Sequence, residues 1–232
     1  MIELDNVTFK WHKNDAKPTL NIPTLRIDKG EHIFLHGPSG VGKSTLLALL
    51  AGINTPSSGN IRILNRDLNT LSNTQRDVFR AENIGYIFQN FNLLPYLTPI
   101  ENVTLGCEFS ESRKQKALQQ TAEPKPSLQN EAIRLLTALG LSESYHSKDV
   151  ASLSIGQQQR VAAARAFIGS PELIIADEPT SALDTANREN FIKLLFEQAK
   201  RANSTLVFVS HDETLKPLFN RAISLVSLQE QL

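Results

Sequence analysis

A glycine-rich run near the start of the chain has the residue types and the spacing that bind phosphate. It reads Gly-Pro-Ser-Gly-Val-Gly-Lys-Ser-Thr over residues 37–45 and matches the pattern Gly-x-x-x-x-Gly-Lys-Ser. Glycine lets the backbone adopt conformations closed to other residues, so the N–H groups can point at phosphate oxygens. Lys43 would reach the terminal phosphates of a nucleotide, and Ser44 would offer its hydroxyl to Mg²⁺. The expected contacts are Gly37, Pro38, Ser39, Gly40, Val41, Gly42, Lys43, Ser44 and Thr45.

The sequence on both sides of this loop gives the context that the motif requires. The run Glu-His-Ile-Phe-Leu-His over 31–36 predicts a buried strand, and the glycine-free apolar run over 46–50 predicts a helix. A strand, a glycine loop and a helix in that order favour phosphate binding over the alternative, a glycine-rich turn before a core helix.

Two adjacent carboxylates follow a second apolar run. Leu173 to Ala176 predicts a buried strand, and Asp177 and Glu178 come directly after it. At the carboxyl end of such a strand, Asp177 would hold Mg²⁺ through water and Glu178 would polarise an attacking water. A solvated strand end is the commoner interpretation of Asp-Glu alone, but the phosphate-binding loop earlier in the chain favours the catalytic one.

Composition limits the class of protein. The chain has 232 residues, of which 41% are apolar, enough for one sizeable core or two tightly associated subdomains. Lys and Arg balance Asp and Glu at 24 each, so no overall basic field indicates a nucleic-acid partner. The one cysteine, Cys107, excludes an internal disulfide framework and fits a reducing compartment. We expect Cys107 to be a buried or surface thiol.

The hydropathy pattern gives no membrane span or leader. The first six residues lack the basic-then-apolar order of a signal peptide, and no stretch reaches the roughly 20 apolar residues of a span. If the protein acts at a membrane, we expect a partner to supply the spans.

The order of elements is β-rich, then helical, then alternating. Residues 110–130, rich in Glu, Lys, Gln and Ser, predict a solvated helix end and then a mobile loop. Helix is expected within 99–141 and 152–167. Strands are expected at 1–9, 20–27, 33–35, 60–64, 84–88, 173–176 and 205–210.

Further motifs, in their order along the chain, resemble those of the ABC ATPase family, and the resemblance covers essentially the whole chain. Residues 153–160, Leu-Ser-Ile-Gly-Gln-Gln-Gln-Arg, resemble the signature loop, and residues 179–184 match the D-loop. Gln89 matches the Q-loop glutamine, His211 the switch histidine and Trp11 the aromatic that stacks on adenine. Taken singly, Gln89 would be a surface amide, His211 a capped strand-end residue and Trp11 a packing residue.

The resemblance implies a fold and a function. The fold is an α/β P-loop NTPase core, a mixed sheet with helices, carrying an N-terminal antiparallel β-subdomain and an inserted α-helical subdomain. The core would comprise 1–92 and 166–232, and the helical subdomain 93–165. The implied function is an ATP-binding and ATP-hydrolysing subunit that couples dimer closure to a separate membrane permease. An ATP-gated scaffold with slow hydrolysis is the alternative, and a repair or translation protein is a third.

The resemblance also implies residue roles in a head-to-tail dimer. Glu178 would act on water and His211 would brace the γ-phosphate. Gln89 would couple the nucleotide to the helical subdomain and contact the metal, with Ser44 and Asp177. From the partner subunit's side of each ATP, Ser154 and Gly156 would contact the γ-phosphate. The expected nucleotide contacts outside the loop are Trp11, Ser154, Gly156 and Asp184.

Within the family, residues 88–95, 97–98 and 100–103 resemble the lipoprotein-releasing, macrolide-exporting and cell-division branch. That branch implies a cytoplasmic protein, peripheral on the inner face of the cell membrane beneath a permease with few spans. The dimer would be a homodimer or a heterodimer with a second ATPase subunit, and no nucleic acid is implied.

One residue departs from the family pattern at a chemically important place. Ile155 stands where the signature carries its first glycine. A β-branched residue resists a positive φ and would crowd the phosphate. The alternative is that its side chain points away and packs while its backbone stays in an ordinary region.

Overall fold

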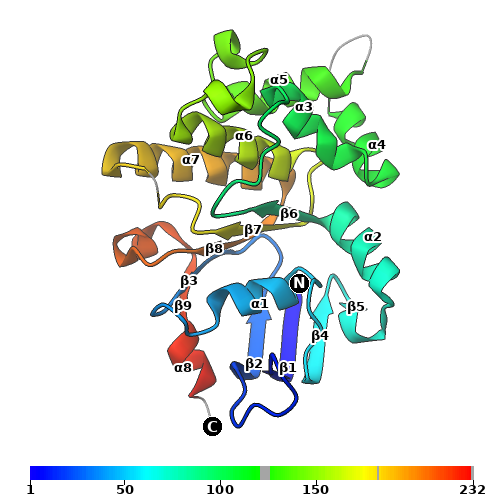
Figure 1. The fold of residues 1–232 in the computed structure, drawn as a ribbon, viewed down its shortest axis with the longest axis vertical. Helices are drawn as coiled ribbons and strands as arrows, with labels where there is room; N and C mark the ends of the chain where they lie inside the picture. Colours follow the sequence, from blue (N-terminus) through cyan, green and yellow to red (C-terminus); the bar gives the residue numbers. More distant parts are fainter. Residues whose placement is uncertain (121–125, 182, 231–232) are drawn as a thin grey trace. The chain divides into compact units, whose positions relative to one another are not determined.

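The computed structural model of the protein describes residues 1–120, 126–181 and 183–230. The chain divides into two compact units (Figure 1). The first unit comprises Met1–Arg80 and Val207–Leu232, and the second comprises Ala81–Leu206. The predicted phosphate-binding loop, Trp11 and His211 belong to the first unit. The other predicted motifs, from Gln89 to Asp184, belong to the second.

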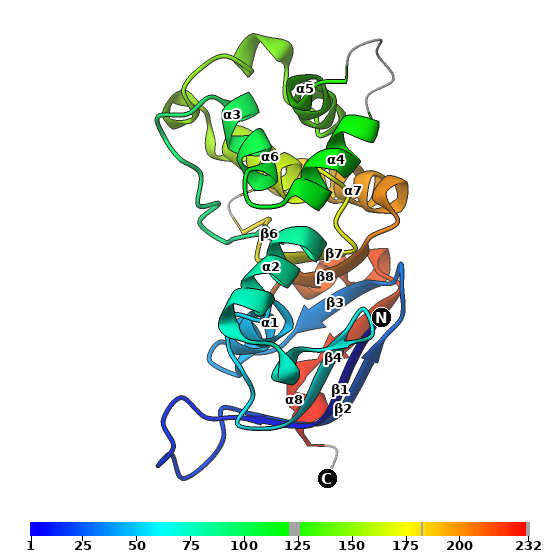
Figure 2. The ribbon, with the colours of Figure 1, turned by 90° about the vertical axis from the view of Figure 1, so that its right-hand side faces the viewer.

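An antiparallel sheet with the order β2-β1-β4-β5 forms one part of the first unit. Its strands are β1 (Ile2–Phe9), β2 (Leu20–Ile27), β4 (Ser58–Ile63) and β5 (Arg66–Asp67). Ile2 pairs with Ile27 on one side and with Ile63 on the other. These three side chains are buried, as expected where one face of a sheet covers a core. The predicted N-terminal antiparallel β-subdomain is confirmed, and Figure 2 shows its strands side by side.

Strand β4 begins at Ser58, two residues before the predicted start at residue 60, and includes Gly59. A β-carbon on Gly59 would lie 2.1 Å from the backbone oxygen of Asn6, and its φ is +82°. The pairing of β1 with β4 shifts register between Asp5 and Thr8, which marks an irregularity at this point. Glycine is therefore required here by a close backbone approach.

The rest of the first unit positions the phosphate-binding loop. Strand β3 (His32–His36) pairs in parallel with β9 (Arg221–Ser224), and α1 (Lys43–Leu50) follows the loop. The boundary between the units falls inside strand β8 (Thr205–Val209). Phe34, Phe208 and Phe219 meet with ring centroids 5.1 to 6.3 Å apart and fill the core beneath these strands. The chain continues from β9 into α8 (Leu225–Gln229).

The second unit contains two parallel strands and a set of helices (Figure 2). Strand β6 (Ile84–Ile87) pairs with β7 (Leu173–Asp177), from Ile84 opposite Leu173 to Ile87 opposite Ala176. Residues 173–176 are fully buried, as the continuous apolar run predicted. The helices are α3 (Pro99–Thr104), α4 (Glu111–Gln119), α5 (Leu128–Ala138), α6 (Ile155–Phe167) and α7 (Thr185–Ala202), while α2 (Asn73–Asn83) crosses the boundary.

Helix α4 lies within the segment that was expected to be a solvated helix end and a mobile loop. The side chain of Arg113 is only 5% exposed and donates hydrogen bonds to the backbone oxygens of Ile168 and Ala166, both at 2.6 Å, and of Ile84 at 3.2 Å. Burial lowers the pKa of Arg113 to about 10, so the guanidinium stays charged at neutral pH. A buried charge with several carbonyl partners anchors the helix. At the other end of the expected segment, residues 128–130 form the first turn of α5 and not a loop, while residues 121–125 lie outside the described part of the chain.

Several elements were not predicted individually, namely α2, α7, α8, β5 and β9. The predicted strands and the signature helix α6 are all present, within two residues at their ends in most cases. The predicted division into 1–92 with 166–232 and 93–165 stays a prediction.

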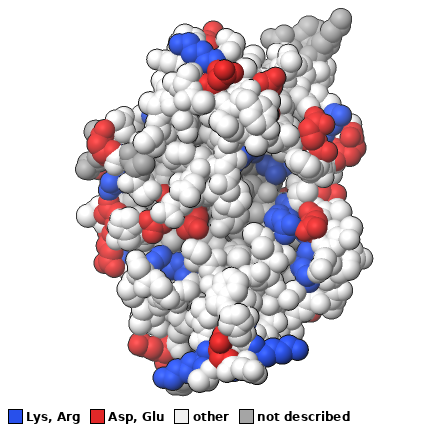
Figure 3. Space-filling model, in the orientation of Figure 1, with Lys and Arg blue, Asp and Glu red and all other residues white. Residues whose placement is uncertain are grey.

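Among the described residues no helix is both long and apolar enough to cross a membrane. Basic and acidic side chains are interspersed over the face shown in Figure 3.

Candidate functional site

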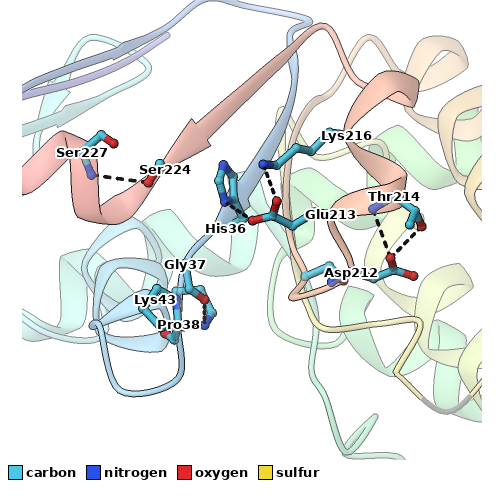
Figure 4. Close-up of polar contacts among 11 residues, drawn as sticks. His36, Gly37, Pro38, Lys43, Asp212, Glu213, Thr214, Lys216, Ser224 and Ser227 are labelled. Atoms are coloured by element: carbon cyan, nitrogen blue, oxygen red, sulfur yellow. Dashed lines mark hydrogen bonds and ion pairs between the residues drawn. The ribbon is translucent and has the colours of Figure 1, made fainter.

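The phosphate-binding loop joins the end of β3 to the start of α1. The ammonium of Lys43 donates hydrogen bonds to the backbone oxygens of Gly37, at 2.8 Å, and Pro38, at 3.1 Å (Figure 4). The first helical residue thus folds its side chain back over the start of the loop. This arrangement holds a positive charge at the place where the motif expects phosphate oxygens.

Two of the loop glycines have left-handed backbone conformations. Gly40 has φ +80° with open space around its α-carbon, so the conformation alone favours glycine there. Gly42 has φ +104°, and a β-carbon on it would lie 2.7 Å from Cδ2 of Leu20 on strand β2. Glycine is therefore required at position 42 by both conformation and space.

The remaining loop residues divide into an exposed and a buried set. Pro38, Ser39 and Ser44 are exposed, whereas Thr45 is buried with the apolar side of α1. The hydroxyl of Ser44 is therefore accessible to a ligand, and Thr45 serves the packing of the helix. The contacts predicted for Val41 and Thr45 with a nucleotide stay predictions.

Trp11 lies in the segment between β1 and β2 and is 58% exposed. Its ring meets Phe9 edge to face, at 5.1 Å between centroids and 89° between planes. This contact supports the indole from one edge and leaves most of its surface available. The exposure suits a stacking platform, whereas the contact with Phe9 agrees with the alternative of a packing residue, so the role of Trp11 toward adenine stays a prediction.

We expect ATP to change the fluorescence of Trp11, which is the only tryptophan in the chain. Trp11→Ala should weaken ATP binding by about 1 kcal/mol in calorimetry, the usual value of one aromatic contact. Trp11→Phe is the matched control, because it keeps a ring and should keep most of the affinity. An emission spectrum that saturating ATP leaves unchanged would place the adenine elsewhere.

A polar cluster beside the loop was not predicted from the sequence. His36, the last residue of β3, lies 3.2 Å from a carboxylate oxygen of Glu213, which also pairs with Lys216 at 2.9 Å (Figure 4). Burial lowers the pKa of His36, Lys216 lowers it further, and Glu213 opposes both. Glu213 is two residues after His211, so this cluster ties the His211 turn to the residue before Gly37. No signal in the sequence links positions so far apart.

His211 itself follows strand β8 and is exposed. The next residue, Asp212, accepts hydrogen bonds from the backbone and the hydroxyl of Thr214, at 3.1 and 2.6 Å (Figure 4). These bonds cap the 3-10 helix over Glu213–Leu218 and shape the turn. The role of His211 toward a phosphate stays a prediction.

In the second unit, the carboxyl ends of β6 and β7 bring three predicted residues to one sheet edge. Ile87 lies opposite Ala176 in a parallel pair, so both strands end at the same edge of the sheet. Asp177 is the last residue of β7, Glu178 follows it, and Gln89 is two residues after the end of β6. Burial, and then the charge of Asp177, raises the pKa of Tyr86 on β6, which places the Asp177 carboxylate near that phenol.

Glu178 has a backbone conformation that is uncommon for its type. Its φ is +46°, in the left-handed region that non-glycine residues seldom adopt. Such a conformation costs of order 1 kcal/mol or more and is concentrated at functional sites. The observation supports the catalytic hypothesis for Glu178 over the solvated strand end.

Gln89 is exposed and begins a loop whose backbone is held by the signature helix. Phe91 and Asn92 both have positive φ, +60° and +50°. Arg165 on α6 donates hydrogen bonds to their two backbone oxygens, at 2.6 Å for Asn92. Sequence reasoning missed Arg165, although a charge inside the alanine-rich run 161–167 of a buried helix was a usable signal.

The signature residues lie at the start of α6. Ser154 caps the helix, accepting from the backbone N–H of Gln157 at 3.3 Å, and Gln157 accepts in return from the Ser154 N–H at 2.9 Å. A β-carbon on Gly156 would lie 3.3 Å from Leu183, so the signature abuts the D-loop. Asp184 caps α7 by accepting from the backbone of Asn187 at 2.9 Å. Ser154 and Asp184 thus have structural roles beside their predicted nucleotide contacts.

Ile155 agrees with one part of its alternative sequence-based interpretation, the ordinary backbone conformation. It is the first residue of α6 and is not among the residues with positive φ, so the expected backbone conflict is absent. Its side chain is 56% exposed, so the packing that the alternative expected is not seen, and the crowding of a phosphate stays a prediction. An isoleucine is tolerated here because the helix begins one residue after Ser154. What it adds is an exposed apolar group beside the signature.

Cys107 is buried, and burial raises the pKa of its thiol to about 11. A thiol that stays protonated at neutral pH is a poor nucleophile. Of the two expected kinds of thiol, buried or surface, Cys107 is the buried kind.

Comparison with known proteins identifies the family. The ABC transporter family model matches residues 20–181. The chain is 33% identical to the lipoprotein-releasing system ATP-binding protein LolD of Bacteroides thetaiotaomicron, covering 97% of each chain. It is 38% identical to the macrolide export ATP-binding/permease protein MacB of Sodalis glossinidius, over 91% of this chain. The chain spans 31% of the length of that MacB protein.

A solved structure agrees over nearly the whole chain. It is the dimeric, post-hydrolysis state of the ATP-binding cassette MJ0796, from Methanocaldococcus jannaschii, bound to ADP and phosphate. The TM-score is 0.83 at 34% identity, over 97% of this chain and 94% of the other. The predicted P-loop NTPase fold is thereby confirmed. The chain belongs to the ABC transporter family, as one of its ATP-binding and ATP-hydrolysing subunits.

Proposed function

We propose that this chain powers a membrane transport complex by binding ATP at residues 37–45 and closing as a dimer that acts on a separate permease. The observation that carries the proposal is the loop in the first unit, where Lys43 is held over the carbonyl oxygens of Gly37 and Pro38. A flexible lysine held in this way needs little rearrangement to meet phosphate oxygens.

The proposed metal is Mg²⁺, which prefers hard oxygen ligands and keeps several waters. The donor set fits this ion, because the hydroxyl of Ser44 is exposed and Asp177 and Gln89 supply a carboxylate and an amide oxygen. Bound Mg²⁺ would neutralise the charge that develops on the phosphates.

The catalytic roles follow from the chemistry of each side chain. Glu178 would accept a proton from the attacking water, and His211 would donate a hydrogen bond to the γ-phosphate. Gln89 would report the state of the nucleotide to the helices of its own unit, since its loop is held to α6 through Arg165. Trp11 would stack on the adenine.

The proposed partners are a second copy of the chain, or a second ATPase subunit, and an integral-membrane permease. In the dimer, Ser154, Gly156 and Asp184 would contact the ATP bound by the opposite subunit. LolD is named as the ATP-binding protein of a lipoprotein-releasing system and MacB as an ATP-binding/permease protein. A similar assembly would place this chain on the cytoplasmic face of the cell membrane.

The dependence of ATPase rate on protein concentration tests this proposal. If hydrolysis requires a dimer, the specific activity should rise with concentration and then saturate. Ile155→Gly and Ile155→Ala should both shift the curve of specific activity to lower protein concentration. The shift should be roughly fivefold if the free energy of dimerisation changes by about 1 kcal/mol. Alanine should act like glycine because the Ile155 backbone is already helical.

Two outcomes would count against these ideas. A specific activity that is independent of concentration would contradict the dimer requirement. Curves for the two variants that overlap the wild-type curve would show that the exposed side chain of Ile155 has no effect on association. Nucleotide affinity at residues 37–45 should be the same in all three proteins, which a titration at low protein concentration checks.

A further inference from the structure

The short helix α8 lies against the phosphate-binding loop. Strand β9 runs parallel to β3 with His36 opposite Ser224, so α8 starts level with the beginning of the loop. The hydroxyl of Ser224 caps the helix by accepting from the N–H of Ser227 at 3.4 Å (Figure 4). Leu225 is fully buried, and its Cβ would lie 3.8 Å from a β-carbon on Gly37. Helix α8 therefore packs against Gly37, the first residue of the loop.

The last residue of α8 reaches the far side of the same loop. The side-chain amide of Gln229 donates to the backbone oxygen of Val41 at 3.2 Å, and its oxygen accepts from the backbone N–H of Asn21 at 3.1 Å. The side-chain amide has both an NH₂ donor and an oxygen acceptor, so it can bond the Val41 oxygen and the Asn21 N–H at the same time. Gln229 thus links the loop to strand β2, in a half-buried position.

The bond to Val41 determines which way the next N–H points. A trans peptide is planar, so the C=O of Val41 and the N–H of Gly42 point in opposite directions. Holding the oxygen toward α8 turns the Gly42 N–H away from α8. Gly42, at φ +104°, is a glycine, whose backbone rotates more freely than that of other residues, so a bond that fixes this peptide restrains it.

We propose that Gln229 is a positioning residue for phosphate binding, which orients the Val41–Gly42 peptide so that its N–H faces the nucleotide phosphates. The inference rests on the proposed binding of ATP at residues 37–45. Without Gln229 the Val41–Gly42 peptide would adopt other orientations as well. ATP would then bind only to the fraction of molecules in which the N–H of this peptide faces the phosphates. One lost hydrogen bond of ordinary strength corresponds to a roughly 3- to 10-fold weaker affinity.

Two variants separate the bonds that Gln229 makes. Gln229→Met keeps the length of the side chain and loses both bonds. Gln229→Glu keeps the acceptor for the backbone N–H of Asn21 but places a carboxylate oxygen against the backbone oxygen of Val41. It should therefore weaken ATP binding at least as much as Gln229→Met does. For Gln229→Met we expect a Kd for ATP and a KM raised 3- to 10-fold, with kcat at saturating ATP within about twofold of wild type. Glu230→Gln, at the exposed neighbouring position, is the control and should match wild type.

Calorimetry, steady-state kinetics and thermal melting of the full chain with and without ATP provide the readouts. A merely structural role would lower the melting temperature without ATP and leave Kd and KM unchanged, which would overturn the proposal. If Gln229→Met does not fold, an unchanged Kd in the isosteric Gln229→Glu variant would overturn it equally. Lys43→Ala separates this inference from the proposed function. Unaltered ATP binding in Lys43→Ala contradicts the loop assignment itself, whereas a loss there with none in Gln229→Met contradicts only the role of Gln229.

Discussion

Glu178→Gln should slow ATP hydrolysis by about 10²- to 10⁴-fold, the usual contribution of a positioned general base, and leave ATP affinity close to wild type. The amide keeps the shape of the carboxylate and loses its basicity. Glu178 lies directly after β7, at the sheet edge that it shares with Gln89, and its backbone has the uncommon φ of +46°. A variant of the same size should keep that backbone, so the loss should appear in kcat.

A trapped state gives a second readout for this variant. ATP-bound dimer should accumulate in Glu178→Gln, because closure is retained while hydrolysis is slow, and size-exclusion chromatography with light scattering would detect it. Glu189→Gln makes the same chemical change at an exposed position of α7 and should hydrolyse ATP normally. Wild-type turnover in Glu178→Gln would falsify the catalytic assignment.

Lys43→Ala should weaken ATP binding by roughly 10- to 100-fold, which corresponds to about 1.5–3 kcal/mol for hydrogen bonds to a charged group. The ammonium lies 2.8 and 3.1 Å from the backbone oxygens of Gly37 and Pro38, and no carboxylate of the described residues forms an ion pair with it. Its charge is therefore available to phosphates. Alanine suits a helix at this position, so α1 should keep its start.

Calorimetry with ATP and with ADP checks the effect of Lys43→Ala. The loss should be larger for ATP than for ADP, because Lys43 is expected at the terminal phosphates. Lys17→Ala, which removes an exposed lysine before β2, is the matched control and should bind ATP as wild type does. Equal affinities for ATP in Lys43→Ala and wild type would show that residues 37–45 are not the phosphate site.

The sequence determined the elements and motifs that depend on local patterns. Apolar runs gave the buried strands β3, β7 and β8, because both faces of a parallel strand need apolar side chains. The alternation of apolar and polar residues predicted β1 and β2, and the glycine pattern predicted the loop between β3 and α1. The family followed from motif order, since residue types at fixed spacings can be compared without any coordinates. The prediction of an inert Cys107 needed only the absence of partners near it in the sequence.

The tertiary structure decided what depends on contacts between distant segments. Residues 111–119 form the helix that composition predicted as a solvated end, but the burial of Arg113 within it was not predictable, because a buried charge needs carbonyl partners that come from remote segments. The bonds of Arg165 to residues 91–92 and of Gln229 to Val41 each join segments more than 70 positions apart. Ile155 was judged from the glycine that it replaces, but its real backbone depends on where α6 begins. Sequence periodicity indicates the local propensity for helix or strand and which face is buried. Hydrogen bonds between side chains and remote carbonyls form only once the strands and helices have packed, so periodicity does not predict them.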